Sequence, residues 1–194
     1  KEGIPVTYLC GTLGEMGRNM GSPFFANRET LPDIRKQELI DACNVLDVNL
    51  EMLGYRDKTI EFESTDEIAE HIKTYLDKIE PSLVITHYPD HAVHPDHNAM
   101  GRAAIEAVRK MDPDKRPEVW AQAITNDKYE TLGKPDIVQN VKEVFETKLK
   151  AIQCHKSQFE GMFKKFEETV AQHGNRDEIY ERFYLEEFYK WKFS

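Results

Sequence analysis

The chain has 194 residues, of which 40% are hydrophobic and 31% are charged, and its formal net charge is −9. This length suits one ordinary domain with a buried core, so we expect a single domain over residues 1–194. The acidic balance argues against a nucleic-acid partner, which requires a basic patch. No apolar run approaches the roughly 20 residues of a membrane helix, so we expect no membrane partner either.

The cysteines indicate the compartment. Cys10, Cys43 and Cys154 are odd in number, are widely spaced and form no CxxC pair. This usage is typical of a reducing environment rather than of a disulfide framework, so we expect a cytoplasmic protein. The chain begins Lys-Glu-Gly, without a signal peptide or an initiator methionine. We therefore expect natural sequence to precede residue 1.

Strand-like and helix-like segments alternate along the chain. The strands are short runs rich in β-formers, and the helices carry apolar residues three to four positions apart. One helix opens with Ser64 three residues before Glu67, which is the pattern of a capping box. In the first half we predict a strand at 4–10, a Gly-rich loop at 11–23, a helix within 28–46, a strand at 49–55, a helix at 64–80 and a strand at 82–88. In the second half we predict a helix at 98–111, strands at 118–125 and 136–141, a helical segment at 144–173 that could break around Gly161, and a tail at 183–193 that is either a strand or a docked aromatic segment.

This alternation predicts βαβ crossovers and an α/β fold, with a mostly parallel, Rossmann-like sheet and helices on both faces. Ligands of such sheets bind beyond the carboxyl ends of the strands. The loops at 11–23, 54–58 and 88–97 should therefore gather on one rim. Gly3 fits the end of a helix ahead of the first predicted strand, so we expect an N-terminal strand of the fold to be missing from this chain.

The stretch YPDHAVHPDHNAMG, residues 88–101, concentrates titratable side chains after the strongest predicted strand. It holds three of the seven histidines and two aspartates, and His87 stands just before it. Neutral imidazole is the commonest metal ligand in proteins, and an aspartate between two histidines can orient one of them. The stretch therefore indicates a metal or proton-transfer site. The alternative is a solvated loop in which Asp96 or His97 caps the following helix.

Five segments together resemble the LmbE/PIG-L family of zinc-dependent N-deacetylases. HPDHNAMGRAA is similar to the second signature of that family, and GTLGEMG is similar to its first post-strand loop with a glutamate. RKQEL resembles its R-x-x-E helix, MLGYRD its LG-x-x-D turn, and KLKAIQCHKSQ its K-x-x-A-x-x-x-H-x-S-Q segment. The stretch GEMGRNMGSPFFANRETLP is most similar to the branch that deacetylates N-acetylglucosaminyl-malate in bacillithiol synthesis.

The resemblance implies one Zn²⁺ per subunit and hydrolysis of the N-acetyl group by metal-activated water. It implies that His97 is a metal ligand, that His94 stabilises the oxyanion of the tetrahedral intermediate as a cation, and that Asp96 holds His94 in that charged form. The other two ligands of the family and its general base belong to an HPDD motif, which this sequence lacks. We expect those residues to lie upstream of Lys1.

The resemblance also implies that Glu15, Arg35 and Asp57 bind the substrate, with Arg35 and Asp57 bonding to sugar hydroxyls. The residues alone leave other roles open. Arg35 could pair with Glu38, three residues on along the same helix face. Asp57 could be an ordinary turn residue after Gly54, and Glu15 could be an exposed loop carboxylate.

Several further residues could approach the substrate. Arg18 and Arg56 are cations near the expected rim and could bind a malate dicarboxylate. His155 approaches the site by the resemblance, or forms a surface polar pair with Gln158. His91 is a weaker candidate ligand because two prolines stiffen its loop.

The expected partner is a small-molecule amino-sugar substrate, and the resemblance adds a homo-oligomer, either a trimer or a hexamer. Within the same chemistry, the protein could instead be an amidase of bacillithiol S-conjugates or a deacetylase of another N-acetylglucosaminide. The alternative of a different class is a non-catalytic fragment of the fold, lacking two metal ligands and the general base.

Overall fold

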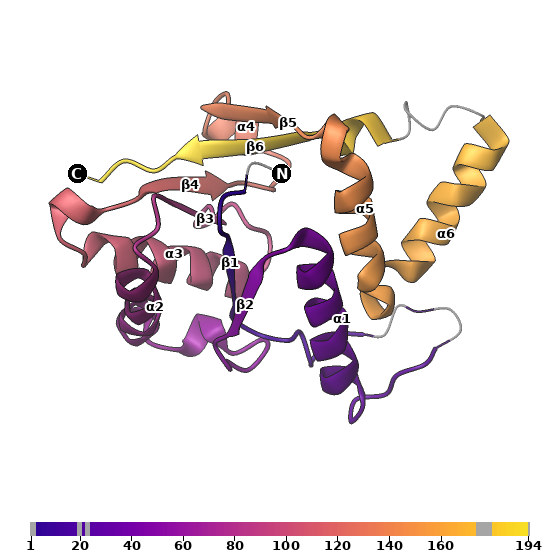
Figure 1. Cartoon of the computed structure of the whole chain (residues 1–194), viewed down its shortest axis with the longest axis horizontal. Coiled ribbons are helices and arrows are strands. Elements are labelled where there is room, and N and C mark those ends of the chain that lie inside the picture. The colour runs from indigo at the N-terminus through magenta and orange to yellow at the C-terminus, as the bar shows by residue number, and fades with distance from the viewer. Residues whose placement is uncertain (1–2, 19–20, 22–23, 174–179, 194) are drawn as a thin grey trace. The chain divides into compact units, whose positions relative to one another are not determined.

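The computed structural model describes residues 3–18, 21, 24–173 and 180–193 (Figure 1). They belong to two compact units, Lys1–Asp57 with Asn140–Leu185 and Lys58–Gln139 with Glu186–Ser194. The prediction of one domain over the whole chain stays a prediction. None of the helices in the described ranges is long and apolar enough to cross a membrane.

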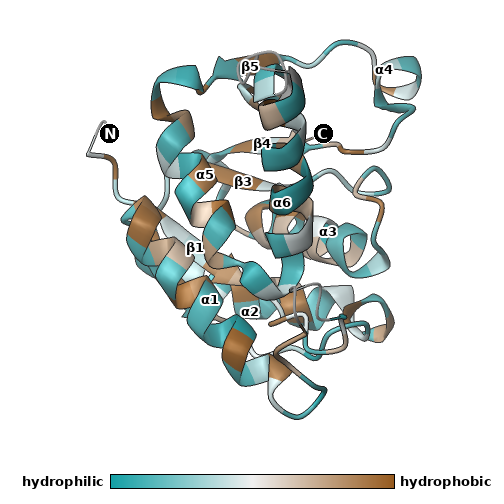
Figure 2. Cartoon of the chain, turned by 90° about the vertical axis from the view of Figure 1, so that its right-hand side faces the viewer, coloured by the Kyte–Doolittle hydropathy of each residue, from teal (hydrophilic) through white to brown (hydrophobic). Residues whose placement is uncertain are grey.

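The first unit begins with a βαβ arrangement of β1 (Thr7–Cys10), α1 (Leu31–Leu46) and β2 (Asn49–Met52). The two strands pair in parallel. Proline stands in the first turn of α1, where its missing N–H has no helical partner to lose, and the helix ends at Asp47 in the left-handed conformation. Figure 2 shows apolar bands between polar ones along α1. The apolar residues of this helix pack with both strands in a small core of Cys10, Leu39 and Cys43, flanked by Leu13, Val48, Leu50 and Met52.

The same unit contains α5 (Phe145–Cys154) and α6 (Lys156–His173). The predicted break near Gly161 was wrong, because the two helices part at His155, where ψ is 58°. Just after this break, the Ser157 N–H bonds to the carboxylate of Glu38 on α1 instead of continuing the hydrogen-bond ladder of α5. The helices pack on an aromatic cluster of Phe145, Leu149, Tyr180 and Tyr184 with Phe163, Phe166, Val170 and Phe183.

The second unit is built on a four-stranded sheet in the order β3-β4-β6-β5. Strands β3 (Leu83–His87) and β4 (Glu118–Gln122) are parallel, and β6 (Leu185–Lys190) is antiparallel to β4. The fourth strand is β5 (Ile137–Asn140). The α/β class is confirmed, and the aromatic tail contributes a strand. Helices α2 (Thr65–Ile79), α3 (Pro95–Arg109) and α4 (Lys128–Thr131) also belong to this unit, with 3-10 turns at Ile60–Phe62 and Pro113–Lys115. The first unit has 3-10 turns at Lys142–Val144 and Glu181–Phe183.

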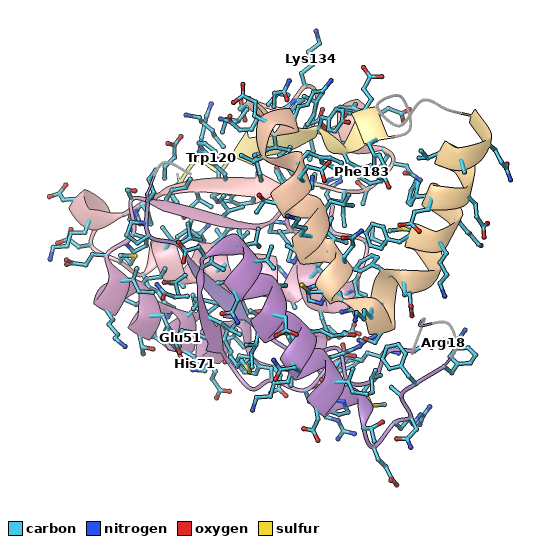
Figure 3. The ribbon with its side chains drawn as sticks, turned by 45° about the vertical axis from the view of Figure 1, so that its right-hand side comes forward. Arg18, Glu51, His71, Trp120, Lys134 and Phe183 are labelled. Carbon is cyan, nitrogen blue, oxygen red and sulfur yellow. The ribbon has the colours of Figure 1, made fainter. Side chains whose placement is uncertain are left out.

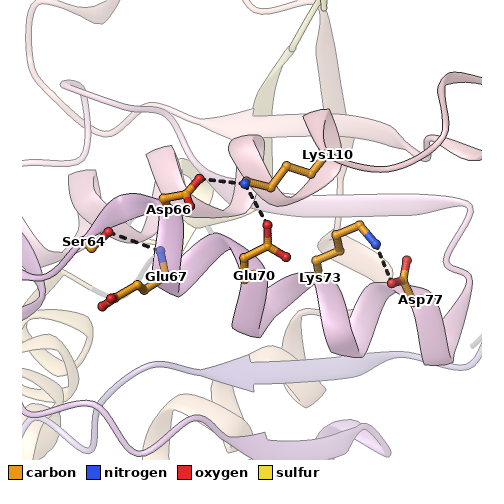
Figure 4. Close-up of polar contacts among 7 residues, drawn as sticks. All are labelled: Ser64, Asp66, Glu67, Glu70, Lys73, Asp77 and Lys110. Carbon is orange, nitrogen blue, oxygen red and sulfur yellow. Dashed lines mark hydrogen bonds and ion pairs between the residues drawn. The ribbon is translucent and has the colours of Figure 1, made fainter.

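Helices α2 and α3 are joined by polar contacts at their surface (Figure 4). The hydroxyl of Ser64 accepts the N–H of Glu67, which confirms the predicted cap of α2. The ammonium of Lys110, just after α3, bonds to Asp66 at 2.6 Å and to Glu70 at 2.7 Å. Below these contacts both helices bury aliphatic residues, among them Ile68, Ile72, Leu76, Ala103, Ala107 and Val108.

Candidate functional site

His94 stands directly before α3 and acts as its N-cap. The following Pro95 is favoured at the first helical position because φ is already set for the helix. The Nδ1 of His94 accepts the backbone N–H of Asp96 at 3.2 Å. A neutral imidazole whose Nδ1 accepts carries its hydrogen on Nε2. The helix start therefore selects the tautomer of His94.

The turn that precedes His94 is strained. Val93 has φ of 63°, in the left-handed region that a β-branched residue rarely occupies. The N–H of His94 bonds back to the carbonyl of Ala92 at 2.6 Å, which closes a three-residue turn around Val93. Strained backbone of this kind is concentrated at functional sites, where the surrounding structure holds it in place.

Asp96 is 4% exposed and lies in the first turn of α3. Its two carboxylate oxygens accept the backbone N–H of Lys58 at 2.6 Å and of Glu61 at 3.3 Å. The carboxylate thus fixes the 58–61 segment to the start of α3. The expected pairing of this carboxylate with the His94 ring takes another form, because the bond between the two residues runs from the Asp96 N–H to Nδ1 of the ring. The catalytic role of Asp96 stays a prediction.

His97 is exposed, and its ring is stacked on that of His87 with centroids 4.4 Å apart and planes 5° apart. The His94 ring is 5.3 Å from it. Burial, and secondarily the nearby His97, lowers the pKa of His87 to about 4, so His87 is neutral at neutral pH. His87 is thus a neutral histidine packed against a neighbouring ring.

Gly101 is what allows α3 to approach β3 so closely. A Cβ at this position would collide with the carbonyl oxygen of His87. The absence of a side chain therefore brings the helix that carries His94 and His97 against the end of the strand that carries His87.

His91 makes its contacts with Tyr88 and with the segment that follows β4. Its Nδ1 lies 3.0 Å from the hydroxyl of Thr125, and its carbonyl accepts the N–H of Ile124 at 2.8 Å. The Tyr88 ring meets it edge-on at 5.5 Å. These contacts attach the loop to the segment after β4 and explain His91 as a structural residue.

The described residues do not fit a complete metal site. They contain no group of three or more His, Cys, Asp or Glu side chains that could hold a metal ion. The thiols are poor candidates, because burial raises the pKa of Cys10 to about 11 and also raises the pKa of Cys43 and of Cys154. His97 could supply one ligand, and no catalytic step through a metal follows from these residues.

In the first unit, Arg35 holds the loop that follows β1. Its guanidinium donates to the carbonyl of Gly14 and, at 3.1 Å, to the carbonyl of Arg18. A Cβ on Gly14 or on Gly17 would collide with the guanidinium, so both glycines make room for it. Burial lowers the pKa of Arg35, whereas Asp57, Glu38 and Glu15 oppose that shift. The side chain remains a cation, with only 7% exposed.

Glu15 and Asp57 bond reciprocally across the same loop. The Asp57 carboxylate accepts the N–H of Met16 at 2.9 Å, and the Glu15 carboxylate accepts the N–H of Asp57 at 2.8 Å. Two buried atoms of this cluster, Glu15 Oε2 and Arg35 Nε, have no hydrogen-bond partner among the described residues. The structure thus brings Glu15, Arg35 and Asp57 together and leaves one acceptor and one donor available.

The alternative role of Arg35, an ion pair with Glu38 on the same helix face, is not supported by the contacts of Glu38. Glu38 is 7% exposed and bonds to Ser157 rather than to the guanidinium. Sequence reasoning did not single out Ser157. The HKSQ segment contains this serine and could have indicated it. Its partner Glu38, however, lies 119 positions away in the sequence.

The weaker candidates are placed as follows. Arg18 lies in the loop after β1 and is exposed (Figure 3). Part of this loop, residues 19–20 and 22–23, lies outside the described residues. Arg56 belongs to the turn after β2, next to Asp57. His155 is half-buried between α5 and α6, with Nδ1 3.4 Å from Gln158 Nε2.

The chain is similar to known proteins in both sequence and structure. Residues 1–108 match the model of the family described as PIG-L: GlcNAc-PI de-N-acetylase. The chain is 50% identical to a Bacillus cereus protein named probable N-acetyl-alpha-D-glucosaminyl L-malate deacetylase 2, over 98% of this chain and 87% of that protein. It is 49% identical to the Bacillus subtilis protein of the same name, over 97% and 85% of the two chains.

Two solved structures show the breadth of the fold. An N,N'-diacetylchitobiose deacetylase from Pyrococcus horikoshii is 25% identical, with a TM-score of 0.71 over 97% of this chain and 73% of that one. GalB, a 4-carboxy-2-hydroxymuconate hydratase from Pseudomonas putida, is 18% identical, with a TM-score of 0.72 over 100% and 86%. Because a hydratase has this fold, the fold alone does not determine the reaction.

Proposed function

Because the chain belongs to the PIG-L family, we propose that it hydrolyses the N-acetyl group of N-acetyl-α-D-glucosaminyl L-malate, releasing acetate and the free amine. The observation that carries this proposal is the 50% identity to the Bacillus cereus protein of that name across almost the whole chain. By the resemblance of its motifs, the reaction belongs to bacillithiol biosynthesis.

His94 is proposed to stabilise the oxyanion that forms when the acetyl carbonyl is attacked. Its Nδ1 is occupied by the Asp96 N–H, so Nε2 is the nitrogen able to donate outward. A donor that is already oriented stabilises developing charge without reorganising during the reaction. Asp96 supports this orientation through its N–H and through the bonds that fix its own carboxylate.

His97 is proposed as one ligand of a catalytic zinc ion. It is exposed, and it stands one helical position after Asp96, with its ring near His94. A single imidazole does not make a zinc site, since such sites use three or four protein ligands. The described residues are therefore assigned two tasks in the reaction, which are to orient His94 and to stabilise the charge of the oxyanion.

Glu15, Arg35 and Asp57 are proposed to bind the sugar. A hydroxyl group is both a donor and an acceptor, which suits the unpartnered Glu15 Oε2 and Arg35 Nε. The proposal extends to Arg18 as a cation for the malate carboxylates and to His155 as a residue near the substrate.

The roles of the two histidines are tested by alanine substitution in the protein expressed from its full coding sequence. His94→Ala should lower kcat by about 10²–10³-fold while zinc content stays at the wild-type level. His97→Ala should lose zinc. His71→Ala is the matched control, because His71 lies on another helix, α2 (Figure 3). Its ring contacts that of Tyr75. Equal loss of zinc in the His94 and His97 variants would contradict the two roles.

The assembly and the compartment are also proposals. We expect a cytoplasmic homo-oligomer, a trimer or a hexamer, without nucleic acid. Light scattering on the purified protein measures the first property, and cell fractionation measures the second.

A further inference from the structure

The junction between α5 and α6 is fixed by several backbone hydrogen bonds of His155. The N–H of His155 bonds to the carbonyl of Ile152, and the carbonyl of His155 accepts the N–H groups of Gln158 and Phe159. His155 thus ends one helix and starts the next. The position of its side chain depends on how the first turn of α6 is held.

That turn is held by one buried carboxylate of α1. Glu38 Oε1 accepts the Ser157 N–H at 2.7 Å, and Glu38 Oε2 accepts the Ser157 hydroxyl at 2.6 Å. Ser157 is fully buried. An unpaired carboxylate would be costly at this depth, whereas bonds from charged acceptors to two donors near a helix N-terminus are strong. The contact is therefore a specific clamp between α1 and α6.

We infer that Glu38 is a positioning residue, which fixes the α5–α6 junction through Ser157 and thereby holds the side chain of His155. The involvement of this junction in deacetylation rests on the proposed function. The clamp itself does not, since it follows from the contacts of the first unit alone.

The surroundings of His155 provide a readout of its position. Burial lowers its pKa most, Glu38 opposes that shift, and Arg35 adds to it. Both charged residues come from α1, while the contact from α6 is the neutral amide of Gln158. If the clamp loosens while Glu38 keeps its charge, the ring gains solvent and its pKa should rise toward the ordinary histidine value.

The test is an NMR titration of His155 in the full-length protein, in two variants that keep the charge of Glu38. Ser157→Ala removes the hydroxyl donor, and Glu38→Asp shortens the carboxylate by one methylene so that it cannot reach both donors. Both should raise the His155 pKa above its wild-type value. Asp41→Asn is the control, because it removes an exposed carboxylate one turn further along α1 and should leave the titration unchanged.

Activity on N-acetylglucosaminyl-malate is measured in the same variants. The clamp predicts a fall in kcat/KM of about 10-fold to 100-fold for Ser157→Ala, as a misplaced group near a substrate would cause. An unchanged His155 titration in both variants, together with a lower melting temperature, would overturn the positioning role. A shifted titration in a protein inactive on every N-acetylglucosaminide would leave the clamp standing and refute the proposed function instead.

Discussion

Asp96 and Glu38 are buried carboxylates that each bond to two donors from a distant part of the chain. They show how a single side chain can set the position of a functional loop or helix end. A carboxylate has no hydrogen to place, so it accepts two N–H or O–H groups without conflict. An amide of the same shape cannot, because its nitrogen is a donor.

Asp96→Asn should therefore destabilise the fold by about 1–3 kcal/mol, since one backbone N–H of the 58–61 segment loses its acceptor. Urea unfolding measures this change. Asp33→Asn is the matched control, because Asp33 is also in the first turn of a helix but is exposed. It should lose only about 0.3–1 kcal/mol of interaction with the helix dipole. Equal losses in the two variants would show that the Asp96 contacts contribute little.

The half-buried His155 makes stability depend on pH. Its pKa is lower in the folded protein than in the unfolded chain, so between these two values the unfolded state binds more protons. Stability should therefore fall as pH drops from neutral through the folded-state pKa. His155→Gln removes this contribution, and the unfolding free energy of the variant should fall less between pH 7.5 and pH 5, which are chosen to bracket about 6.5, the ordinary histidine pKa. Parallel pH profiles for variant and wild type would be the contrary result.

At the scale of elements, the contact of α3 with β3 depends on Gly101. Glycine inside a helix normally costs about 1 kcal/mol relative to alanine, and here the space that Gly101 leaves lets the helix lie against the His87 carbonyl. Gly101→Ala should place a methyl group against the His87 carbonyl and destabilise the protein by about 1–3 kcal/mol. Thermal unfolding measures the effect. Gly161→Ala, within α6, should be neutral or stabilising, and a stabilised Gly101→Ala variant would disprove the close contact.

The elements that local pattern controls were predictable from the sequence. The strand at β3, the cap at Ser64 and the helix predicted at 98–111 follow from periodicity and capping. All are present, although the helix begins inside HPDH, at Pro95, and ends at Arg109. The break at His155 was misplaced because it depends on Glu38, 119 positions from Ser157. The two partners of Asp96 were equally hidden, since Lys58 and Glu61 are backbone donors and their side chains carry no signal.

The candidate site could be predicted in part. The resemblance named Glu15, Arg35 and Asp57, and the first unit brings them together. The resemblance could not reveal that Arg35 binds backbone carbonyls of the glycine-rich loop. Every residue has a backbone carbonyl, so the sequence does not show which one is bound. The ring stack of His97 on His87 was also missed, since it requires the close approach at Gly101.

At the scale of the whole molecule, the net charge of −9 opposes the approach of a dianionic malate substrate. Affinity for such a substrate must come from cations close to the site, which is the reason to retain Arg18 and Arg56 as candidates. The net charge thus makes local recognition more important than long-range attraction.

The proposed reaction of this protein is the removal of acetate from N-acetyl-α-D-glucosaminyl L-malate. The most direct measurement is the release of acetate and of free amine from that compound by the protein expressed from its full coding sequence, with a bacillithiol S-conjugate assayed in parallel. We predict equal amounts of acetate and amine, formed faster than cleavage of the conjugate and abolished by His97→Ala. Absence of acetate release from every N-acetylglucosaminide offered, in a folded and zinc-loaded protein, would contradict the claim.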